Sequence, residues 1–241
     1  SSTASGDARA RDLAARGGVF TLRERGLAAD GSVVDTSRTV DSIVRALTLR
    51  DDFDAFLATA PNQTVSTRVI NVDRWGFVAT APKAASSPGR LAAWVWTRRD
   101  AGLPGLTILP CELIAENGSK LRAMVGECDP DPALGAWLDA QCVFADTLVD
   151  RICTQDPDDP LAAIVETYTF WAIRGERTGA LGRLADANPG GIVVEPEIAR
   201  YALRKVRILN GLHTAMASIA GPRYGVETVR EALEHPELGS W

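Results

Sequence analysis

Short hydrophobic runs alternate with polar ones along the first hundred residues, and their spacing changes from one run to the next. The segments "GGVFTLRERG" and "GSVVDTSRTV" are rich in β-branched residues and flank the turn "LAADG", so they predict two strands of a hairpin. In "DDFDAFLATA" the apolar positions follow helical spacing instead, with Phe53, Phe56 and Leu57 on one face. Strand and helix patterns therefore alternate from the start of the chain.

The same alternation continues up to the loop that follows Pro110. "STRVINVDRWGFV" predicts a further strand, and "PGRLAAWVWTRRDAG" predicts a helix that buries Leu91, Trp94 and Val95. The next run, at 106–109, is short and apolar and is closed by Pro110. A fully apolar run of this length between helices is typical of a strand that is covered on both faces. These patterns together predict an α/β fold.

From about residue 118 the apolar spacing becomes helical. It predicts helices at 119 to 127, 132 to 152, 160 to 174, 197 to 219 and 226 to 234. In this interpretation the strands stop near residue 118. An α/β part is then followed by an all-α part, with the boundary between about 118 and 155.

One motif of dinucleotide-binding folds is missing from the chain. Such a fold begins with a strand, a glycine-rich turn and a helix whose N-terminus holds the pyrophosphate. The sequence contains no G-x-G-x-x-G or close variant, and "ARGG" at 15 to 18 follows a helix-like run instead of a strand. If the chain descends from a dinucleotide enzyme, that first unit is missing.

Composition narrows the class of protein further. With 46% hydrophobic and 24% charged residues over 241 positions, the chain resembles a soluble globular protein. Its net charge of -5 argues against a nucleic-acid partner, although a local basic pocket for a small anion remains possible. No apolar run reaches the length of about 18 residues that a membrane span needs, and the N-terminus lacks the apolar centre of a signal peptide. We therefore expect a cytoplasmic protein with no membrane partner.

Cysteine and histidine usage argues against a metal site. The four cysteines, Cys111, Cys128, Cys142 and Cys153, are spaced as neither CxxC nor a zinc ribbon, and the sequence has only two histidines. We expect reduced thiols that pack as small hydrophobic residues, and no metal.

The segment "KVRILNGLH" places three polar side chains in the last quarter of the chain. In an α-helix that has Lys205 at 0°, His213 lies at about 80° and Asn210 at about 140°, so all three share one face. Leu209 and Leu212 border this face. Two interpretations remain open. The three residues form an ordinary helix face with a lysine that extends to solvent, or they form a metal-free site for alcohol and ketone chemistry.

In the second interpretation each residue type has a chemical role. A lysine beside apolar surface and two arginines suits a general base for a hydroxyl proton. An asparagine amide can donate a hydrogen bond to a developing alkoxide, and a histidine can orient a substrate hydroxyl.

Four segments resemble one family of enzymes, and they occur along the chain in the same order as in that family. "KVRILNGLHTAM" resembles the K-x-x-x-x-N-x-x-H motif of the long-chain mannitol dehydrogenase family, and the agreement is closest with its uronate branch. "LPCELIAENGSKLRAMV" is similar to that branch's strand and loop, "FADTLVDRI" to its V-D-R-I segment, and "VETYTFWAIRG" to its E-P-x-x-x-W-x-I segment. "TVREALEHPELGSW" resembles the sequence after the catalytic helix, so the resemblance covers about residues 105 to 241.

The resemblance implies a fold and a set of site residues. The fold would be a partial Rossmann-like nucleotide-binding domain at 1–118, followed by a mostly α-helical substrate domain at 119–241. Lys205 would be the general acid/base, and Asn210 and His213 would bind the reacting oxygen and neighbouring hydroxyls.

Four further residues are implied with open alternatives. Asp150 would be an acidic residue of the substrate site, or a helix-terminal partner of Arg151. Arg207 would receive a substrate carboxylate, or face solvent. In the loop after the strand, Asn117 and Glu112 are candidates for cofactor contact, although Asn-Gly is also a common turn.

Several positions depart from the family pattern. Leu113 stands where the mannitol branch has an asparagine, which favours the uronate branch. "INVDRWGF" at 70 to 77 replaces the segment expected beside the nicotinamide, and Thr167 replaces a proline. The chain looks like the central portion of an enzyme, shortened at both ends.

The resemblance implies an NAD-dependent reduction of a keto-hexuronate, tagaturonate to altronate. A sugar acid or polyol would be the small-molecule partner. Mannitol 2-dehydrogenase or fructuronate reductase specificity is the alternative within this class. A catalytically silent remnant that acts as an interaction module is the alternative outside it. The sequence leaves the oligomeric state and the choice of NAD or NADP open.

Overall fold

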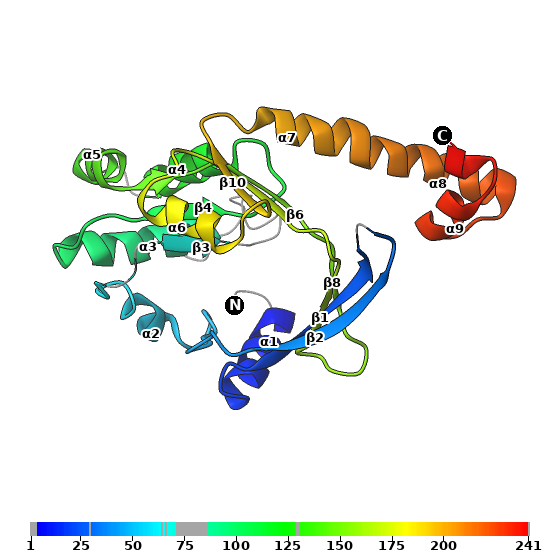
Figure 1. Ribbon diagram of the computed structural model, residues 1–241. Coiled ribbons are helices and arrows are strands. Elements are labelled where there is room, and N and C mark those ends of the chain that lie inside the picture. Colours follow the sequence, from blue (N-terminus) through cyan, green and yellow to red (C-terminus); the bar gives the residue numbers. More distant parts are fainter. Residues whose placement is uncertain are drawn as a thin grey trace. The chain divides into compact units, whose positions relative to one another are not determined.

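The chain divides into two compact units, and each is described here by itself. The computed structural model describes residues 4–28, 30–63, 65, 67–70, 86–128 and 131–240. The first unit is Ser1–Pro196 and the second is Glu197–Trp241 (Figure 1). In the part of the chain that the structure describes, no helix has both the length and the apolar character needed to cross a membrane.

The first unit mixes helices and short strands, which confirms the α/β class. Its helices are α1 (Ala4–Ala15), α2 (Phe53–Leu57), α3 (Ser87–Asp100), α4 (Asn117–Glu127), α5 (Pro132–Gln141) and α6 (Gly179–Ala187). Its strands are β1 (Phe20–Leu27), β2 (Val33–Val40), β3 (Thr67–Ile70), β4 (Thr107–Pro110), β5 (Val143–Phe144), β6 (Thr147–Asp150), β7 (Cys153–Gln155), β8 (Ala163–Val165), β9 (Phe170–Arg174) and β10 (Ile192–Glu195).

A parallel sheet contributes to the largest hydrophobic cluster of the described residues. The strand order is β3-β4-β5, and both pairs are parallel. Helices α2 to α5 pack their apolar faces into one core with it. Leu91, Trp94 and Val95 are buried on α3, and β4 is the buried strand that the run at 106–109 predicts. The strand expected from 66 to 78 is observed up to Ile70, and its remainder lies outside the described residues.

Local sequence explains where α3 begins and ends. Pro88 stands in the first turn, and the Ser86 side chain accepts a hydrogen bond from the backbone N–H of Gly89, so one of the free N–H groups at the helix start is capped. Arg98 and Arg99 lie in the last turn, and Gly102 follows with φ 68°. Basic residues and a left-handed glycine are both favourable at a helix C-terminus.

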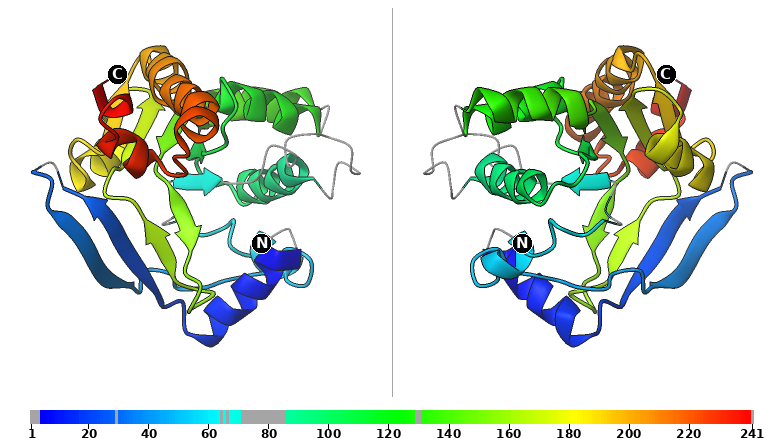
Figure 2. Two further views of the ribbon diagram at one scale, coloured as in Figure 1. Left: turned by 90° about the vertical axis from the view of Figure 1, so that its right-hand side faces the viewer. Right: turned by 90° about the vertical axis from the view of Figure 1, so that its left-hand side faces the viewer.

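Strands β5 to β10 all lie after residue 118, so the expectation that the strands stop there is wrong, and two further sheets use them. One sheet has the order β2-β1-β8-β7 and the other β10-β9-β6 (Figure 2). The helix expected at 132 to 152 ends at Gln141, and the helix expected at 160 to 174 is replaced by β8 and β9. Both segments are rich in β-branched and aromatic residues, and spacing in short apolar runs does not separate a helix from a strand.

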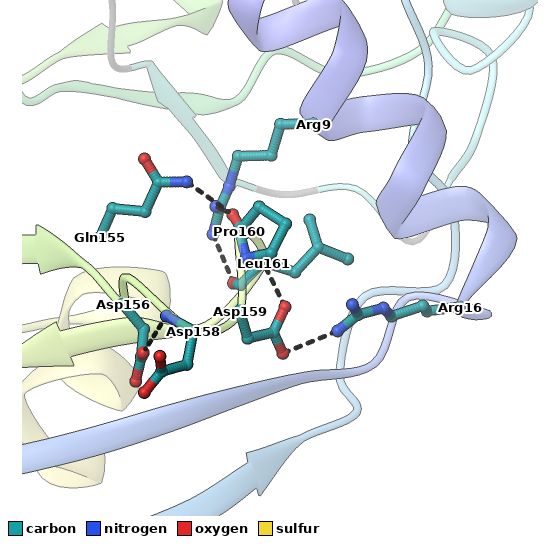
Figure 3. A network of polar contacts seen from close by, with 8 residues as sticks. All are labelled: Arg9, Arg16, Gln155, Asp156, Asp158, Asp159, Pro160 and Leu161. Carbon is teal, nitrogen blue, oxygen red and sulfur yellow. Dashed lines mark hydrogen bonds and ion pairs between the residues drawn. The ribbon is translucent and has the colours of Figure 1, made fainter.

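Helix α1 is held against the loop between β7 and β8 by two arginines (Figure 3). The Arg9 guanidinium donates to the carbonyls of Pro160 at 2.6 Å and Leu161 at 2.7 Å. Arg16 pairs with Asp159 at 2.8 Å. The "ARGG" turn ends this helix, as its sequence context predicts, and does not open one.

All the regular elements of the second unit, within its described residues, are helical. Its elements are α7 (Ala199–Arg204), a π-helical segment η3 (Lys205–Asn210), α8 (Gly211–Tyr224), α9 (Val229–Glu234) and a short 3-10 turn η4 (Leu238–Ser240). The helices expected at 197 to 219 and 226 to 234 are therefore confirmed. Ala220, Ala232 and Leu238 form a small core, and a capping box of Thr228 and Glu231 starts α9.

The division between units falls at Pro196, after the last strand. Compactness alone does not define a nucleotide-binding or a substrate domain. The boundary between 118 and 155 that the sequence suggests for those domains stays a prediction.

Candidate functional site

The three polar residues of "KVRILNGLH" lie on one continuous helical stretch of the second unit (Figure 1). Lys205 and Asn210 are the first and last residues of the π-helical segment, and His213 lies in the first turn of α8. Lys205 is half-buried, while Asn210 and His213 are exposed. The structure thus keeps the three residues on one element, with a change of helix type between them.

The π-helical segment corrects the angle expected for an α-helix. Hydrogen bonds from residue i+5 to residue i put more than 3.6 residues in each turn, so residues five apart lie within about 60° instead of about 140°. Lys205 and Asn210 are five apart, and their side chains therefore leave the helix closer together than α-helical geometry allows. Short π segments of this kind occur frequently at functional sites.

Apolar side chains border this face but are themselves accessible. Leu209 is 40% exposed and Leu212 is 55% exposed. Met216, one turn further on, packs against the small core of the second unit. The polar face therefore lies beside apolar surface, as the sequence suggests, and that surface is open within the described residues.

The two arginines near Lys205 have different surroundings. Arg207 is exposed and follows Lys205 by two residues, which puts it on roughly the opposite side of a helix. Arg204 lies over the ring of Tyr201, at 5.4 Å from its centroid, and Arg200 lies at 4.8 Å from the same centroid. The structure therefore does not bring Arg207 to the face of Lys205.

Asn117 opens α4 and is fully buried. Its side-chain amide donates to the carbonyls of Pro110 at 3.2 Å, Glu112 at 3.0 Å and Thr147 at 3.1 Å. Its carbonyl oxygen accepts from the Thr147 backbone N–H at 2.8 Å. The side chain thus ties the ends of β4 and β6 together, and its role in cofactor contact stays a prediction. Glu112 is also buried, at 5% exposure.

Asp146 is a buried carboxylate that sequence reasoning missed. It accepts from the Ser119 backbone N–H at 2.9 Å and from the Ser119 hydroxyl at 3.2 Å, so it caps the N-terminus of α4 from another segment. Arg174 donates to the same carboxylate at 3.3 Å. These three residues line a cavity of about 360 Å³, together with Glu176 and Pro196. The only sequence signal for it is an aspartate after the apolar "VFA".

Asp150 is the last residue of β6, is half-buried, and pairs with Phe170 of β9 in the sheet. The neighbouring Arg151 donates from two nitrogens to the Glu166 carbonyl, at 3.1 and 2.9 Å, and pairs with the Glu24 carboxylate at 2.8 Å. Through these contacts Arg151 binds β1 and the segment before β9. The proposed role of Asp150 in a substrate site stays a prediction.

Cys111, Cys128 and Cys142 are partly buried, as the sequence suggests, whereas Cys153 is exposed. All four are free thiols. Burial raises the pKa of the Cys111 thiol to about 11, which keeps it neutral and a poor nucleophile at neutral pH. Cys142 has a raised pKa for the same reason.

A Rossmann-type fold implies a nicotinamide dinucleotide, and the described residues fit only part of it. The carboxyl ends of the parallel strands β3, β4 and β5 meet at one edge, where such folds bind ligands. A pyrophosphate needs free N–H groups at a helix start. In α4, which follows β4, the first-turn N–H of Ser119 is already bound to Asp146. The first turn of α4 therefore does not offer a free N–H of Ser119 to a pyrophosphate.

Parallel strands with covering helices define the chain as an α/β protein whose sheet is of the nucleotide-binding type. A family model described as mannitol dehydrogenase Rossmann domain matches residues 26–182, which is more than half of the chain. The chain belongs to this mannitol dehydrogenase family, which confirms the resemblance and the Rossmann-type fold.

Relatives and solved structures agree with this assignment. Altronate oxidoreductase of Bacillus subtilis is 30% identical over 263 residues, which cover 97% of this chain and 54% of the relative. The Klebsiella pneumoniae enzyme of the same name is 32% identical, over 92% of this chain and 51% of the relative. The chain therefore spans about half the length of the curated relatives it matches.

Two solved structures share the fold at lower identity. A substrate-free D-sorbitol dehydrogenase has a TM-score of 0.82 and 19% identity, over 100% of this chain and 55% of that one. The ternary complex of Pseudomonas fluorescens mannitol 2-dehydrogenase with NAD and D-mannitol has a TM-score of 0.74 and 21% identity, over 98% of this chain and 53% of that one. At these identities the likeness concerns the fold alone.

Proposed function

We propose that this chain carries the acid/base helix of an NAD-dependent reductase that converts a keto-hexuronate, tagaturonate, to altronate. The observation that carries the proposal is the helix at 205–213, where a π segment begins at Lys205 and ends at Asn210. The similarity to altronate oxidoreductases over 92% to 97% of the chain supports the choice of substrate class.

Each residue of this helix has one role in the proposal. The Lys205 ammonium group donates its proton to the ketone oxygen as that oxygen becomes a hydroxyl. The Asn210 side-chain amide donates a hydrogen bond to the same oxygen while negative charge develops on it. The His213 imidazole orients a neighbouring substrate hydroxyl. NADH, when bound, supplies the hydride, and no metal is needed.

The remaining sequence candidates have weaker support. Asp150 is proposed as an acidic residue of the substrate site. Asn117 and Glu112 are proposed to act near the cofactor, and the hydrogen bonds of Asn117 favour an indirect effect through the loop after β4. Arg207 stays a candidate for the substrate carboxylate, although its position opposite Lys205 weakens that role.

The experiment is NADH oxidation with tagaturonate, followed by absorbance, for the wild-type chain and for Lys205→Met. General acid/base catalysis contributes about 10² to 10⁴ in rate, so Lys205→Met is expected to lose at least 100-fold in kcat. Lys120→Met is the matched control, because Lys120 is an exposed lysine on α4, far along the chain from this helix. It should turn over like the wild type.

The same assay decides between the alternatives. Faster turnover of mannitol or fructuronate would replace the proposed substrate within the same class, and the structural likeness to a mannitol 2-dehydrogenase makes that comparison worthwhile. Failure of the wild-type chain to turn over any of these substrates, with no NADH binding in calorimetry, would favour an interaction module. A Lys205→Met variant within tenfold of the wild type would show that Lys205 is not the acid.

A further inference from the structure

A joint between two sheets lies immediately after Asp150. Residues 151–152 lead from β6 in one sheet to β7 in another, and residues 166–169 return from β8 to β9. The strands pair as antiparallel neighbours on both sides of the joint, β6 with β9 and β7 with β8. Because two residues face four across the joint, the regular ladder of the sheets is interrupted there.

Arg151 and Glu166 hold this joint closed. The Arg151 guanidinium donates twice to the Glu166 carbonyl, and the Glu166 carboxylate accepts from the Ile152 backbone N–H at 2.5 Å. The Glu166 backbone N–H in turn donates to the Ile152 carbonyl at 3.2 Å. The two segments of the joint therefore bind each other through both side chains and backbone groups.

The same guanidinium reaches a third strand. It pairs with Glu24 of β1 at 2.8 Å, where the side chains of Arg151 and Glu24 are 27% and 40% exposed. Glu24 lies opposite Val165 in the β1–β8 pair, directly before Glu166. The planar guanidinium binds a carbonyl and a carboxylate at the same time, so it fixes the direction of both contacts as well as their length. A lysine ammonium group does not reproduce this geometry.

Asp150 is therefore held from both sides. Its backbone is paired with Phe170 on β9, and the next peptide leads directly to the Arg151 fork. We infer that Arg151 is a positioning residue, which sets the orientation of Asp150 for the reaction by locking the joint between the two sheets. This inference rests on the proposed function, in which Asp150 belongs to the substrate site.

A double-mutant cycle tests the inference. The wild type, Asp150→Asn, Arg151→Met and the double variant are compared by kcat/KM for the keto-hexuronate. A small misplacement of a reacting group costs about tenfold to a hundredfold, so Arg151→Met is expected to lose at least tenfold. If Arg151 acts through Asp150, the double variant should be no slower than Asp150→Asn by more than about twofold. Arg151→Lys should lie between Arg151→Met and the wild type, because it keeps the charge without the fork.

The outcomes that overturn the inference are distinct from a failure of the proposed function. Losses that multiply in the double variant would show that Arg151 does not act through Asp150. An Arg151→Met variant with wild-type kcat/KM and only a lower melting temperature would show a merely structural role. A wild-type chain without turnover would instead remove the proposed function, and this inference with it.

Hydrogen exchange checks the geometry without any turnover. In Arg151→Met the backbone amides of Ile152 and Glu166 should exchange faster, because both take part in the joint. Arg23→Met is the matched control, since Arg23 lies next to Glu24 on β1 but pairs with Asp35 across the hairpin. It should leave exchange at the joint and kcat/KM unchanged. Unchanged exchange in Arg151→Met would overturn the inference.

Discussion

Replacing Arg98 by methionine should destabilise the first unit more than any ordinary surface change. Arg98 lies in the last turn of α3, is 1% exposed, and donates to four backbone carbonyls. Its Nε donates to Pro104 at 2.7 Å, and its terminal nitrogens donate to Ala60 at 3.0 Å, Asn62 at 2.9 Å and Val65 at 2.9 Å. One side chain thereby ties the loop after α2 to the loop that precedes β4.

The magnitude follows from the carbonyls that the substitution leaves behind. A buried acceptor that loses its partner costs about 1 to 3 kcal/mol, and water entering from the nearby loops recovers part of that. For four carbonyls we expect a loss of about 4 to 6 kcal/mol in the free energy of unfolding, which is large against a typical total of about 5 to 15 kcal/mol. For a chain of this size the melting temperature should fall by roughly 10 to 20 °C.

Arg68 supplies the comparison, because it packs on the same Trp94 ring, while its Nε has no hydrogen-bond partner among the residues that the structure describes. Its guanidinium lies 4.8 Å from the Phe56 ring centroid and 4.7 Å from that of Trp94, and burial lowers its pKa to about 10. The burial cost implied by that shift is about 3 kcal/mol, and the two rings return about 1 to 2 kcal/mol of it. Arg68→Met should therefore leave stability unchanged or raise it by up to about 2 kcal/mol.

Urea unfolding followed by circular dichroism measures all of these variants. Arg98→Lys should fall between the wild type and Arg98→Met, since an ammonium group cannot reach four separated carbonyls. If Arg98→Met lost less than about 2 kcal/mol, or if Arg68→Met lost as much, carbonyl satisfaction would not be the source of the stability, and the reasoning would be refuted.

Three further predictions concern other parts of the chain. Asn117→Ala should cost about 3 kcal/mol in urea unfolding, because it frees the buried carbonyls of β4 and β6; weaker NADH binding at unchanged stability would instead identify a cofactor contact. Burial raises the pKa of the Cys111 thiol from 9.0 to about 11 in the folded state, so the thiol of the unfolded state ionises first as the pH rises. The free energy of unfolding is therefore highest below pH 9 and falls by about 2 kcal/mol as the pH rises towards 11. Cys111→Ala should flatten this part of the stability profile, and an equally steep fall in that variant would assign the effect to other groups. Thr228→Ala should cost about 1 kcal/mol by removing the cap of α9, visible as lost helical ellipticity, whereas Thr228→Ser should retain the cap.

The elements that could be predicted from the sequence are those that local signals determine. Helix α3 has its cap, its proline, its apolar face and its terminal glycine between Ser86 and Gly102, so no distant partner is needed to place it. Strand β4 is likewise a short apolar run between two helices. The segments at 147–155 and 163–174 differ, because β6 pairs with β9 and β7 with β8, so each needs a strand that is distant in sequence to form its ladder. Their apolar spacing fits a helix as well as a strand.

The helical stretch that carries the candidate residues could be predicted, but its geometry could not, and the roles of the residues stay predictions. The motif spacing puts Lys205, Asn210 and His213 on one helix, and the structure agrees. The π segment could not be predicted, because no proline, glycine or cap marks its start at Lys205. For Asn117 the sequence shows only an Asn-Gly turn, since its partner Thr147 lies 30 residues further along.

Thr167 ties the return segment of the joint to β1. Proline is expected there from the resemblance, and a proline would lack a side-chain donor. The Thr167 hydroxyl donates to the Leu27 carbonyl at 3.1 Å, at the end of β1. Gly26 makes room for it, because a Cβ at that position would lie only 3.1 Å from the Thr167 hydroxyl oxygen.

Threonine and glycine therefore form a matched pair, and the pair binds the return segment of the joint to β1. Arg151 does the same from the other segment, through Glu24 of the same strand. Both ties hold the joint after Asp150 against β1. Asp150 therefore precedes a joint that is held to β1 at both segments, by the Thr167 hydroxyl on one and by the Arg151 guanidinium on the other.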